Sequence, residues 1–235
     1  MTQPSEQDSS PAGIPAGLAA SAAAVFGDRL PVAVRYAELL ATAGVERGLI
    51  GPRETPRLWD RHLINCAVVG ELLPHGTTVI DVGSGAGLPG IVLAIARPDL
   101  HITLLEPLLR RATFLAEAVE ALELSTVEVV RGRAEEVAGQ LSAPVLTARA
   151  VAPLDRLARW CLPLASKGGR LLAMKGSSAE AEVLEHAAAL RRAGGGAPRI
   201  FECGKGVADP PTVVVEVPLL DTPPRPGRRR SRQGS

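Results

Sequence analysis

A glycine-rich stretch that follows a short apolar segment constrains this chain more than any other feature. Residues 77–82, TTVIDV, are mostly β-branched and apolar, a pattern that is typical of a buried strand. Gly83, Gly85, Gly87 and Gly90 come next, and an apolar helical pattern begins near the last of them. Glycine allows positive φ angles and lets a ligand approach the main chain closely. The stretch therefore predicts a strand, a glycine turn and a helix, with a ligand bound at the turn.

Two classes of cofactor fit such a turn, and residues 85–90 even match the dinucleotide fingerprint G-x-G-x-x-G. Asp81 separates the two classes. A carboxylate beside the turn would repel a pyrophosphate, which needs bare N–H groups and a helix N-terminus. The same carboxylate would attract the sulfonium and ammonium groups of S-adenosylmethionine. We therefore expect S-adenosylmethionine rather than NAD. The alternative for Asp81 is that it ties the turn together by accepting backbone N–H bonds.

The length and charge of the chain limit its architecture and its partners. With 235 residues, 46% of them hydrophobic, it can form one sizeable α/β domain and a small extension. The net charge is +1, but residues 222–235 contain five arginines and no acid. The remainder carries 21 basic and 25 acidic residues, a charge of about −4. This balance argues against a strongly basic nucleic-acid binder, so local patches and the tail would have to attract any RNA.

The three cysteines, Cys66, Cys161 and Cys203, lie far apart and show no C-x-x-C spacing. They predict free, mostly buried thiols in a reducing cytoplasm, and no metal site. We expect no apolar run to reach the length of a membrane span, and residues 12–26 lack the basic leader of a secretory signal. We expect a cytoplasmic protein that is a monomer.

The chain divides by pattern into four parts. Residues 1–17 are predicted to be disordered, 18–74 to form a helical extension, 75–220 a Rossmann-like domain, and 221–235 a basic disordered tail. In the extension we expect helices at 18–26, 31–43 and 58–73, with a loop at 51–56. In the domain we expect parallel strands at 77–82, 101–105, 127–131, 145–150 and 169–175, with helices at 89–96, 108–122, 134–137 and 153–164 between them. A helix at 179–192 and an antiparallel pair at 199–203 and 212–217 complete it. This order predicts the α/β fold of a class I, Rossmann-like methyltransferase, with a mostly parallel seven-stranded sheet.

Ligands of such sheets lie beyond the carboxyl ends of the strands, where the strand order reverses. At the first strand end we expect the turn from Asp81, including Gly83 and Gly85, to hold the cofactor, with Leu88 packing under it. Glu106 ends the second strand, where its carboxylate can accept both ribose hydroxyls, although capping the next helix is the alternative. After the third strand, Ala134-Glu135 opens a short helix, and Glu135 can accept the adenine amino hydrogens.

Basic residues end the next two strands. Arg149 follows an apolar strand, where an arginine is costly unless it has a partner, so we expect it to face the cleft. Lys175 likewise closes an apolar strand and is expected to point over the sheet edge at the site, a solvated strand end being the alternative. Arg61 and His62, on the third helix of the extension, either face the cleft or form a solvated edge.

Two motifs that are absent from the sequence limit the kinds of methyl acceptor. An amino-group methylase would carry an Asn/Asp-Pro-Pro-aromatic run after the fourth strand, where this chain has ARAVAP. A pyrimidine C5 methylase needs a nucleophilic cysteine, and no cysteine stands in a Pro-Cys context near a strand end. What remains is an acceptor that needs no activation, such as N7 of a purine, whose lone pair is already free. Catalysis would then consist mostly of aligning that nitrogen with the sulfonium methyl group.

The chain contains four motifs: WDRHL at 59–63, DVGSGAGLPG at 81–90, Arg149-Ala150 and MKG at 174–176. Together they resemble the RsmG/GidB family of bacterial 16S rRNA guanine-N7 methyltransferases. The similarity covers residues 31–217, and GLPG is much more specific than the glycines alone. The chain departs from the family pattern at Asn65-Cys66, where Asp-Ser is common, and at Glu106, where Asp is frequent.

The resemblance implies S-adenosylmethionine as methyl donor and N7 of a guanine (position 527) in the 16S rRNA of the small ribosomal subunit as acceptor. By position, the family's cofactor contacts fall on Gly83, Leu88, Ala134, Glu135 and Arg149. On this basis Arg149 and Lys175 are the catalytic candidates, and these two with Arg61 and His62 are the RNA-binding candidates. Another RNA or a small molecule as acceptor, an NAD-dependent oxidoreductase and a non-catalytic ribosome-binding protein are the alternatives.

Overall fold

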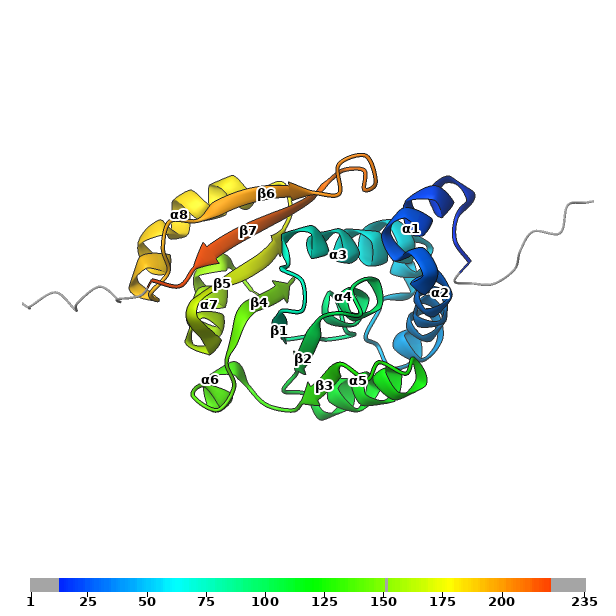
Figure 1. The fold of residues 1–235 in the computed structure, drawn as a ribbon, viewed down its shortest axis with the longest axis horizontal. Helices are drawn as coiled ribbons and strands as arrows, with labels where there is room; N and C mark the ends of the chain where they lie inside the picture. The colour runs from blue at the N-terminus through cyan, green and yellow to red at the C-terminus, as the bar shows by residue number, and fades with distance from the viewer. Residues whose placement is uncertain (1–12, 151, 221–235) are drawn as a thin grey trace, which may run out of the picture.

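A seven-stranded sheet runs through the centre of the protein (Figure 1), in the order β3-β2-β1-β4-β5-β7-β6. The computed structural model describes residues 13–150 and 152–220, so the predictions for residues 1–12 and for the tail at 221–235 lie outside the described residues. The strands are β1 (Thr78–Val82), β2 (His101–Leu105), β3 (Val127–Val130), β4 (Ala143–Arg149), β5 (Ala165–Lys175), β6 (Arg199–Cys203) and β7 (Thr212–Pro218). The first five pair in parallel, and β7 lies antiparallel between β5 and β6. The predicted fold class and the terminal antiparallel pair are confirmed. The order reverses between β1 and β4, which opens a crevice at their carboxyl ends.

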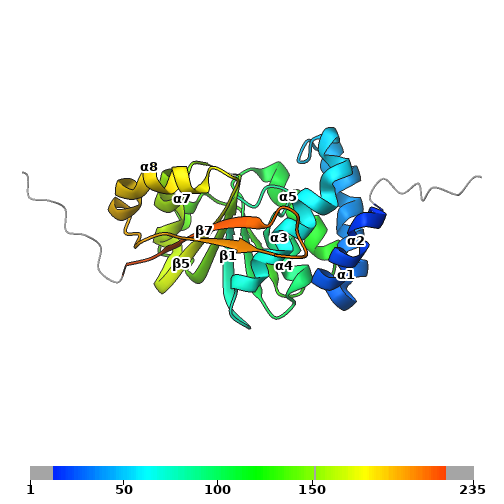
Figure 2. The ribbon, with the colours of Figure 1, turned by 90° about the horizontal axis from the view of Figure 1, so that it is seen from above.

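Helices cover both faces of the sheet (Figures 1 and 2). One face carries α4 (Gly90–Ala96) and α5 (Leu109–Ala121), and the other carries α6 (Ala134–Val137), α7 (Leu154–Cys161), η7 (Leu162–Leu164) and α8 (Ala179–Arg192). Side chains along a strand alternate between the faces. Val79 accordingly belongs to the core with α4 and α5, and its neighbour Ile80 to the core with α7 and α8.

The predicted extension is helical and packs on the α4 face of the sheet. Its elements are η1 (Ala16–Leu18), α1 (Ala19–Phe26), η2 (Gly27–Arg29), α2 (Leu30–Leu39), η3 (Leu40–Gly44), η4 (Pro52–Arg57), η5 (Leu58–Ile64), α3 (Asn65–Ala67) and η6 (Val68–Leu72). The Phe26 and Trp59 rings meet edge to face, with centroids 6.2 Å apart. Both residues share one hydrophobic cluster with Ile91 and Leu93 of α4. The extension therefore has no core separate from the sheet.

Several predicted boundaries differ from the structure. The loop predicted at 51–56 is the 3₁₀ helix η4, because Pro52 fits a first helical position and the Glu54 amide donates to Gly51 O at 2.8 Å. The helix predicted at 58–73 runs as π, α and 3₁₀ turns in succession. Residues 16 and 17, predicted to be disordered, belong to η1. β4 and β5 also begin earlier than predicted, and the β4 register shifts at Pro144, which lacks an N–H donor.

One stretch, Ala16–Gly44, contradicts the expectation that no apolar run is long enough to span a membrane. By length and composition alone its 29 residues, with a hydropathy of 1.3, are apolar enough to cross a membrane. In the structure the stretch turns at Gly27, whose φ is +48°, and α1 and α2 pack against each other. Ala22, Phe26 and Tyr36 then face the core. The buried residues recur at helical spacing, so each helix has one face toward the core and the rest of its surface exposed or partly exposed.

The extension contacts and stabilises the glycine turn through Tyr36, the single tyrosine of the sequence. Tyr36 of α2 is fully buried, and its hydroxyl donates a hydrogen bond of 2.6 Å to Ala86 O. Burial, with the nearby Cys66 and Asp81, raises the pKa of Tyr36 well above its usual value, so the hydroxyl keeps its proton. At the far end of the extension, the Gly204 amide donates to the Glu71 carboxylate at 3.1 Å. Both contacts hold the helices to the sheet.

We expect Tyr36→Phe to lower the free energy of unfolding by about 1–3 kcal/mol, because Ala86 O would lose its partner in a buried site. Chemical denaturation of the two proteins measures this difference. Because the ring and its packing are kept, unchanged stability would show that the hydroxyl contributes nothing to holding the loop.

Candidate functional site

The glycine turn between β1 and α4 depends on glycine both for conformation and for packing. Gly83, Gly85 and Gly87 have φ angles of 73°, 60° and 95°, values that residues with a Cβ rarely adopt. A Cβ on Gly87 would lie 2.6 Å from Ile91 Cδ1 and 2.8 Å from the Tyr36 hydroxyl. The α4 helix and the extension therefore press directly against the backbone of the turn.

The amides of this turn are already used within the protein. Those of Gly83 and Ser84 donate to Leu105 O at 2.8 and 3.2 Å, and those of Gly87 and Leu88 donate to Ser84 O at 2.7 and 3.1 Å. The Gly85 amide donates to Glu106 Oε2 at 2.9 Å. A phosphate bound here would find these donors engaged and a carboxylate among them.

Asp81 lies beneath the turn rather than in the wall of a cavity. Its side chain is 1% exposed, Oδ2 accepts the Gly90 amide at 3.0 Å, and Oδ1 accepts the Thr147 hydroxyl at 3.1 Å. Burial raises the pKa of Asp81 to about 6, although these hydrogen bonds lower it. This corrects the expectation that Asp81 faces the cofactor. The geometry is that of the alternative, in which the carboxylate ties the start of α4 to β1.

Glu106 lies at the end of β2 and does line a cavity. Besides the Gly85 amide, its carboxylate accepts the Leu108 amide through Oε1 at 3.0 Å, so it also caps the approach to α5. Arg111 Nη1 stands 4.0 Å from Oε2. A carboxylate has about four acceptor positions, of which the two amides take one on each oxygen. Glu106 is only 1% exposed, so its carboxylate opens to the cavity by a narrow edge. The structure shows the helix-capping alternative, and the ribose contact stays a prediction.

Two adjoining cavities open at the carboxyl ends of the strands. The loop cavity has a volume of about 640 Å³, which is within the range of small-molecule sites. The adjoining cavity, of about 150 Å³, shares Gly83, Pro107 and Arg133 with it. The loop cavity brings together these predicted site residues: Gly83, Gly85, Leu88, Glu106, Arg149 and His62. The adjoining cavity takes Ala134 and Glu135, with Trp160 of α7 beside them. The strand-end prediction therefore places most of its residues around one continuous site.

Arg149 reaches from β4 to the extension. Its Nη1 donates to Cys66 Sγ at 3.0 Å, and its Nη2 lies 3.2 Å from Arg61 O and 2.6 Å from His62 Nδ1. Arg149 thus has the partners that an arginine in an apolar strand end needs. Cys66, one of the residues at which the chain departs from the family pattern, contributes a sulfur that accepts hydrogen bonds only weakly.

His62 and Arg61 occupy different places. His62 is 8% exposed, and its Nε2 lies 3.0 Å from Glu54 Oε2. Burial and the charge of Arg149 lower the pKa of His62 to about 4, although Glu54 raises it. Arg61 has an exposed side chain that pairs with Glu54 at 3.4 Å. His62 therefore faces the loop cavity as a neutral ring, whereas Arg61 remains at the surface.

Lys175 does not line either cavity, which corrects the prediction that its side chain points at the site. Its Nζ donates to Ala152 O at 3.0 Å and pairs with Glu182 Oε2 at 2.8 Å. Burial raises the pKa of Glu182, but Lys175 and other donors outweigh it, so the net shift is downward. Arg149 is aligned with Met174 in the β4–β5 pairing. Lys175, one residue later, therefore points to the opposite face of the sheet, toward α8.

Several supporting residues were missed from the sequence: Tyr36, Glu54, Thr147 and Glu182. Tyr36 and Thr147 act from elements distant in the chain, whereas Glu54 and Glu182 lie on the elements next to the residues they support. Tyr36 could have been considered, since it is the one tyrosine of the sequence, and so could Trp160 of the adjoining cavity, since it is one of two tryptophans. Glu54, Thr147 and Glu182 carry no local signal, because an acid or a threonine on a helix or strand is common.

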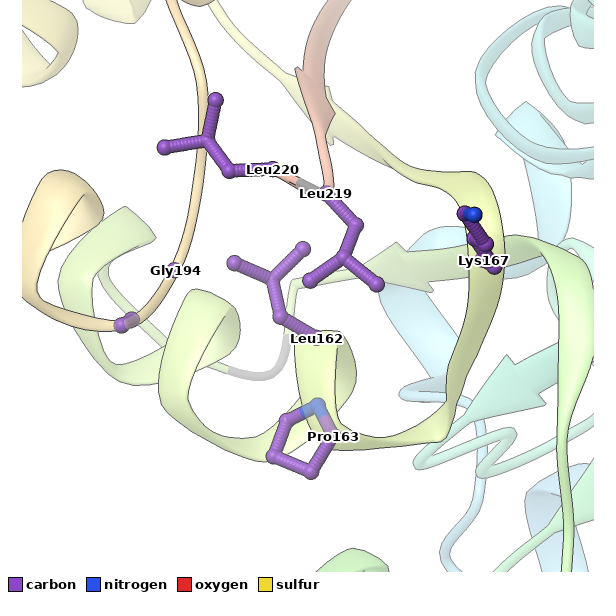
Figure 3. Close-up of a pocket in the computed structure, with 7 residues that line it drawn as sticks. Leu162, Pro163, Lys167, Gly194, Leu219 and Leu220 are labelled. Atoms are coloured by element: carbon purple, nitrogen blue, oxygen red, sulfur yellow. The ribbon is translucent and has the colours of Figure 1, made fainter. Parts of the chain in front are cut away.

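Two further hollows lack the predicted site residues. The one in Figure 3, of about 380 Å³, lies near the amino end of β5, with Leu162 and Leu219 close together and Lys167 on a separate part of its wall. A groove of about 900 Å³ lies between the extension and the β6–β7 loop. Within residues 13–150 and 152–220, no group of three or more His, Cys, Asp or Glu side chains is placed to hold a metal ion.

The architecture is the fold of the class I, Rossmann-like methyltransferases. A SAM-dependent methyltransferase from Aquifex aeolicus superposes with a TM-score of 0.52 at 19% identity, covering 76% of this chain and 98% of that one. M. jannaschii TYW2, solved in complex with AdoMet, gives a TM-score of 0.53 at 13% identity, covering 69% and 78%. At such identities the likeness concerns the fold.

Sequence comparison identifies the family. Residues 29–207 match the family described as rRNA small subunit methyltransferase G. The protein named ribosomal RNA small subunit methyltransferase G from Salinispora arenicola is 61% identical over 230 residues, 94% of this chain and 95% of that protein. The one from Thermobifida fusca is 58% identical over 220 residues, covering 88% and 93%. The chain therefore belongs to the rRNA small subunit methyltransferase G family, and the resemblance predicted from its motifs is confirmed.

We expect the burial of Asp81 to be measurable as a pH dependence of stability. The pKa of Asp81 is about 6 in the folded protein and near 3.8 when unfolded, so the folded state binds more protons between these values. The wild type should therefore gain stability relative to Asp81→Asn as the pH falls from about 7 to 4, by on the order of 3 kcal/mol. Parallel denaturation of both proteins across this range measures the gain, and a constant difference would contradict it.

Proposed function

We propose that the protein transfers the methyl group of S-adenosylmethionine to N7 of a guanine in the 16S rRNA of the small ribosomal subunit, in the bacterial cytoplasm. The choice of cofactor rests on the glycine turn. Most of its amides donate hydrogen bonds to Glu106 or to main-chain carbonyls. Membership of the rRNA small subunit methyltransferase G family supports RNA as the acceptor.

The residues around the two cavities fit S-adenosylmethionine better than a dinucleotide. A pyrophosphate binds to free N–H groups at a helix N-terminus. Here the Gly85 amide is bonded to Glu106 and the Gly90 amide, the first of α4, to Asp81. Both carboxylates would also repel phosphate charge. A cofactor without phosphates, carrying cationic groups, meets none of these penalties.

Each cavity residue then has a defined task. We assign the ribose hydroxyls to the remaining acceptor positions of Glu106, and the adenine amino group to Glu135 in the adjoining cavity. Gly83 and Gly85 let the cofactor lie close to the main chain, and Leu88 supplies an apolar surface. Arg149, from the opposite wall, contacts the bound cofactor or the RNA. When bound, S-adenosylmethionine supplies an electrophilic methyl group on its sulfonium sulfur, which takes the electron pair of the broken bond.

The lining of the loop cavity supports an acceptor that needs no deprotonation. Among its described lining residues, Glu106 is the only carboxylate, and both of its oxygens accept amide hydrogens. His62 is neutral but directs Nδ1 at Arg149. Purine N7 has a free lone pair and can be methylated by alignment alone.

Exposed arginines surround the mouth of the site. Arg133 lines both cavities, Arg111 lines the loop cavity, and Arg61 lies on the neighbouring surface of η5. We infer that they contact phosphates of the RNA, since such contacts position a nucleic acid without reading its sequence. The binding should accordingly weaken as salt is raised.

Cofactor thermal shift provides a first test. We expect S-adenosylmethionine or S-adenosylhomocysteine at 100-fold its dissociation constant to stabilise the protein by about 2.7 kcal/mol. NAD at the same concentration should leave the melting temperature unchanged, because most amides of the turn are already hydrogen-bonded within the protein. Stabilisation by NAD alone would favour the oxidoreductase alternative.

A methylation assay tests the acceptor. Small subunits or their RNA from a strain that lacks the activity, incubated with the protein and S-adenosylmethionine, should yield 7-methylguanine on digestion and mass spectrometry. Arg149→Ala should lower the rate at least about ten-fold, as expected for loss of a charge-assisted contact. Cofactor binding without 7-methylguanine would instead favour another RNA, a small molecule or a binding role.

A further inference from the structure

The guanidinium of Arg149 is held by three acceptors from consecutive turns of the extension. His62 Nδ1 lies closest, at 2.6 Å, followed by Cys66 Sγ at 3.0 Å and Arg61 O at 3.2 Å. Sulfur is a weak acceptor. The ring nitrogen of His62 and the Arg61 carbonyl therefore set most of the orientation of Arg149, and both come from η5.

The chemistry of these groups fixes the tautomer of His62. A guanidinium has only donors, so the nitrogen that faces it must carry a lone pair. Nδ1 is therefore unprotonated, and the ring hydrogen sits on Nε2. Nε2 lies 3.0 Å from Glu54 Oε2, so it donates to that carboxylate. Glu54, on η4, thereby selects the tautomer that can accept from Arg149.

We propose that His62 is a positioning residue that aims Arg149 along the wall of the loop cavity, and that Glu54 holds His62 in the tautomer that this requires. The inference deepens the proposed function and rests on it in one respect, namely that Arg149 contacts the cofactor or the RNA. His62 then acts through Arg149 and does not touch the RNA itself.

The charged groups around His62 agree with this arrangement. Arg149 faces it from β4, Glu54 from η4, and Arg61 lies next to it on η5, itself 3.4 Å from the same Glu54 carboxylate. The Cys66 thiol, whose pKa is raised by burial, adds no charge. Protonation of His62 would turn Nδ1 into a donor that faces another donor, and Arg149 would lose this contact.

Substitution of His62 by Asn or by Gln tests the roles of its two ring nitrogens separately. In His62→Asn the amide oxygen can take the place of Nδ1 and accept from Arg149. In His62→Gln the amide extends toward the place of Nε2, near Glu54, and nothing replaces the acceptor. His62→Ala removes both. Glu54→Gln keeps an oxygen for Nε2–H, whereas Glu54→Ala does not.

The first measurement needs no activity. Nitrogen NMR of the histidine rings, with His62 assigned by its loss in His62→Asn, should show a neutral ring protonated at Nε2 down to about pH 5, where an ordinary histidine of pKa near 6.5 is charged. In Glu54→Ala, where Arg149 still requires the lone pair of Nδ1, the share of the Nε2–H tautomer should fall measurably without reversing. A ring protonated at Nδ1, or one charged at pH 6, would overturn the proposal.

The second measurement is a double-mutant cycle with Arg149→Ala, read as kcat/KM for RNA methylation and as the dissociation constant of S-adenosylmethionine. His62→Ala should cost about ten-fold in the wild-type background and less than about two-fold in Arg149→Ala. His62→Asn should stay within about three-fold of wild type, and His62→Gln should resemble His62→Ala. His75→Ala, at an exposed ring near the amino end of β1, is the control and should change neither quantity.

Three outcomes would overturn the proposal: no effect of His62→Ala, equal losses in His62→Ala and His62→Asn, or losses that add in full to those of Arg149→Ala. No effect of Arg149→Ala on either quantity would overturn it as well. If the acceptor is not this RNA, methylation fails in every variant alike, whereas the cofactor cycle and the ring tautomer still decide the role of His62. Melting temperatures of all variants identify any loss due to unfolding.

Discussion

Two buried carboxylates determine the form of the cofactor site. Asp81 and Glu106 are each 1% exposed, and ionised groups at such positions are costly unless hydrogen bonds replace water. The amides of Gly85, Gly90 and Leu108 supply those bonds. The same bonds fix the path of the turn and leave it poor in free donors. One arrangement therefore both stabilises the turn and leaves few amide donors for a phosphate.

The helical extension belongs to the site as much as the sheet does. Tyr36 holds the backbone of the turn from one side, and η5 supplies the acceptors that orient Arg149 on the other. Because the extension and α4 share one hydrophobic cluster, these contacts are held by a packed interface. The arginines near the cavity mouth come from both parts, so an RNA that binds there would touch the extension and the sheet together.

Strand-end reasoning placed three of its residues at the cavities. Glu106 and Arg149 line the loop cavity, and Glu135 lines the adjoining one. Lys175 points to the opposite face of the sheet and Asp81 lies under the turn, because a side chain at a strand end can lie on either face of the sheet or beneath the loop that follows. The partners that settle these positions, Glu182 and Thr147, lie on a later helix and strand, and no local pattern marks them.

The sequence by itself determined the alternation of strands and helices, the glycine turn and the family, because these depend on local periodicity, on backbone freedom and on motifs contiguous in the chain. Only the tertiary structure decided which carboxylate supports the turn and which lines the cavity, and which basic residue reaches the site. Those outcomes depend on the register between β4 and β5 and on how the extension packs. A one-residue shift in register would send each side chain to the opposite face of the sheet.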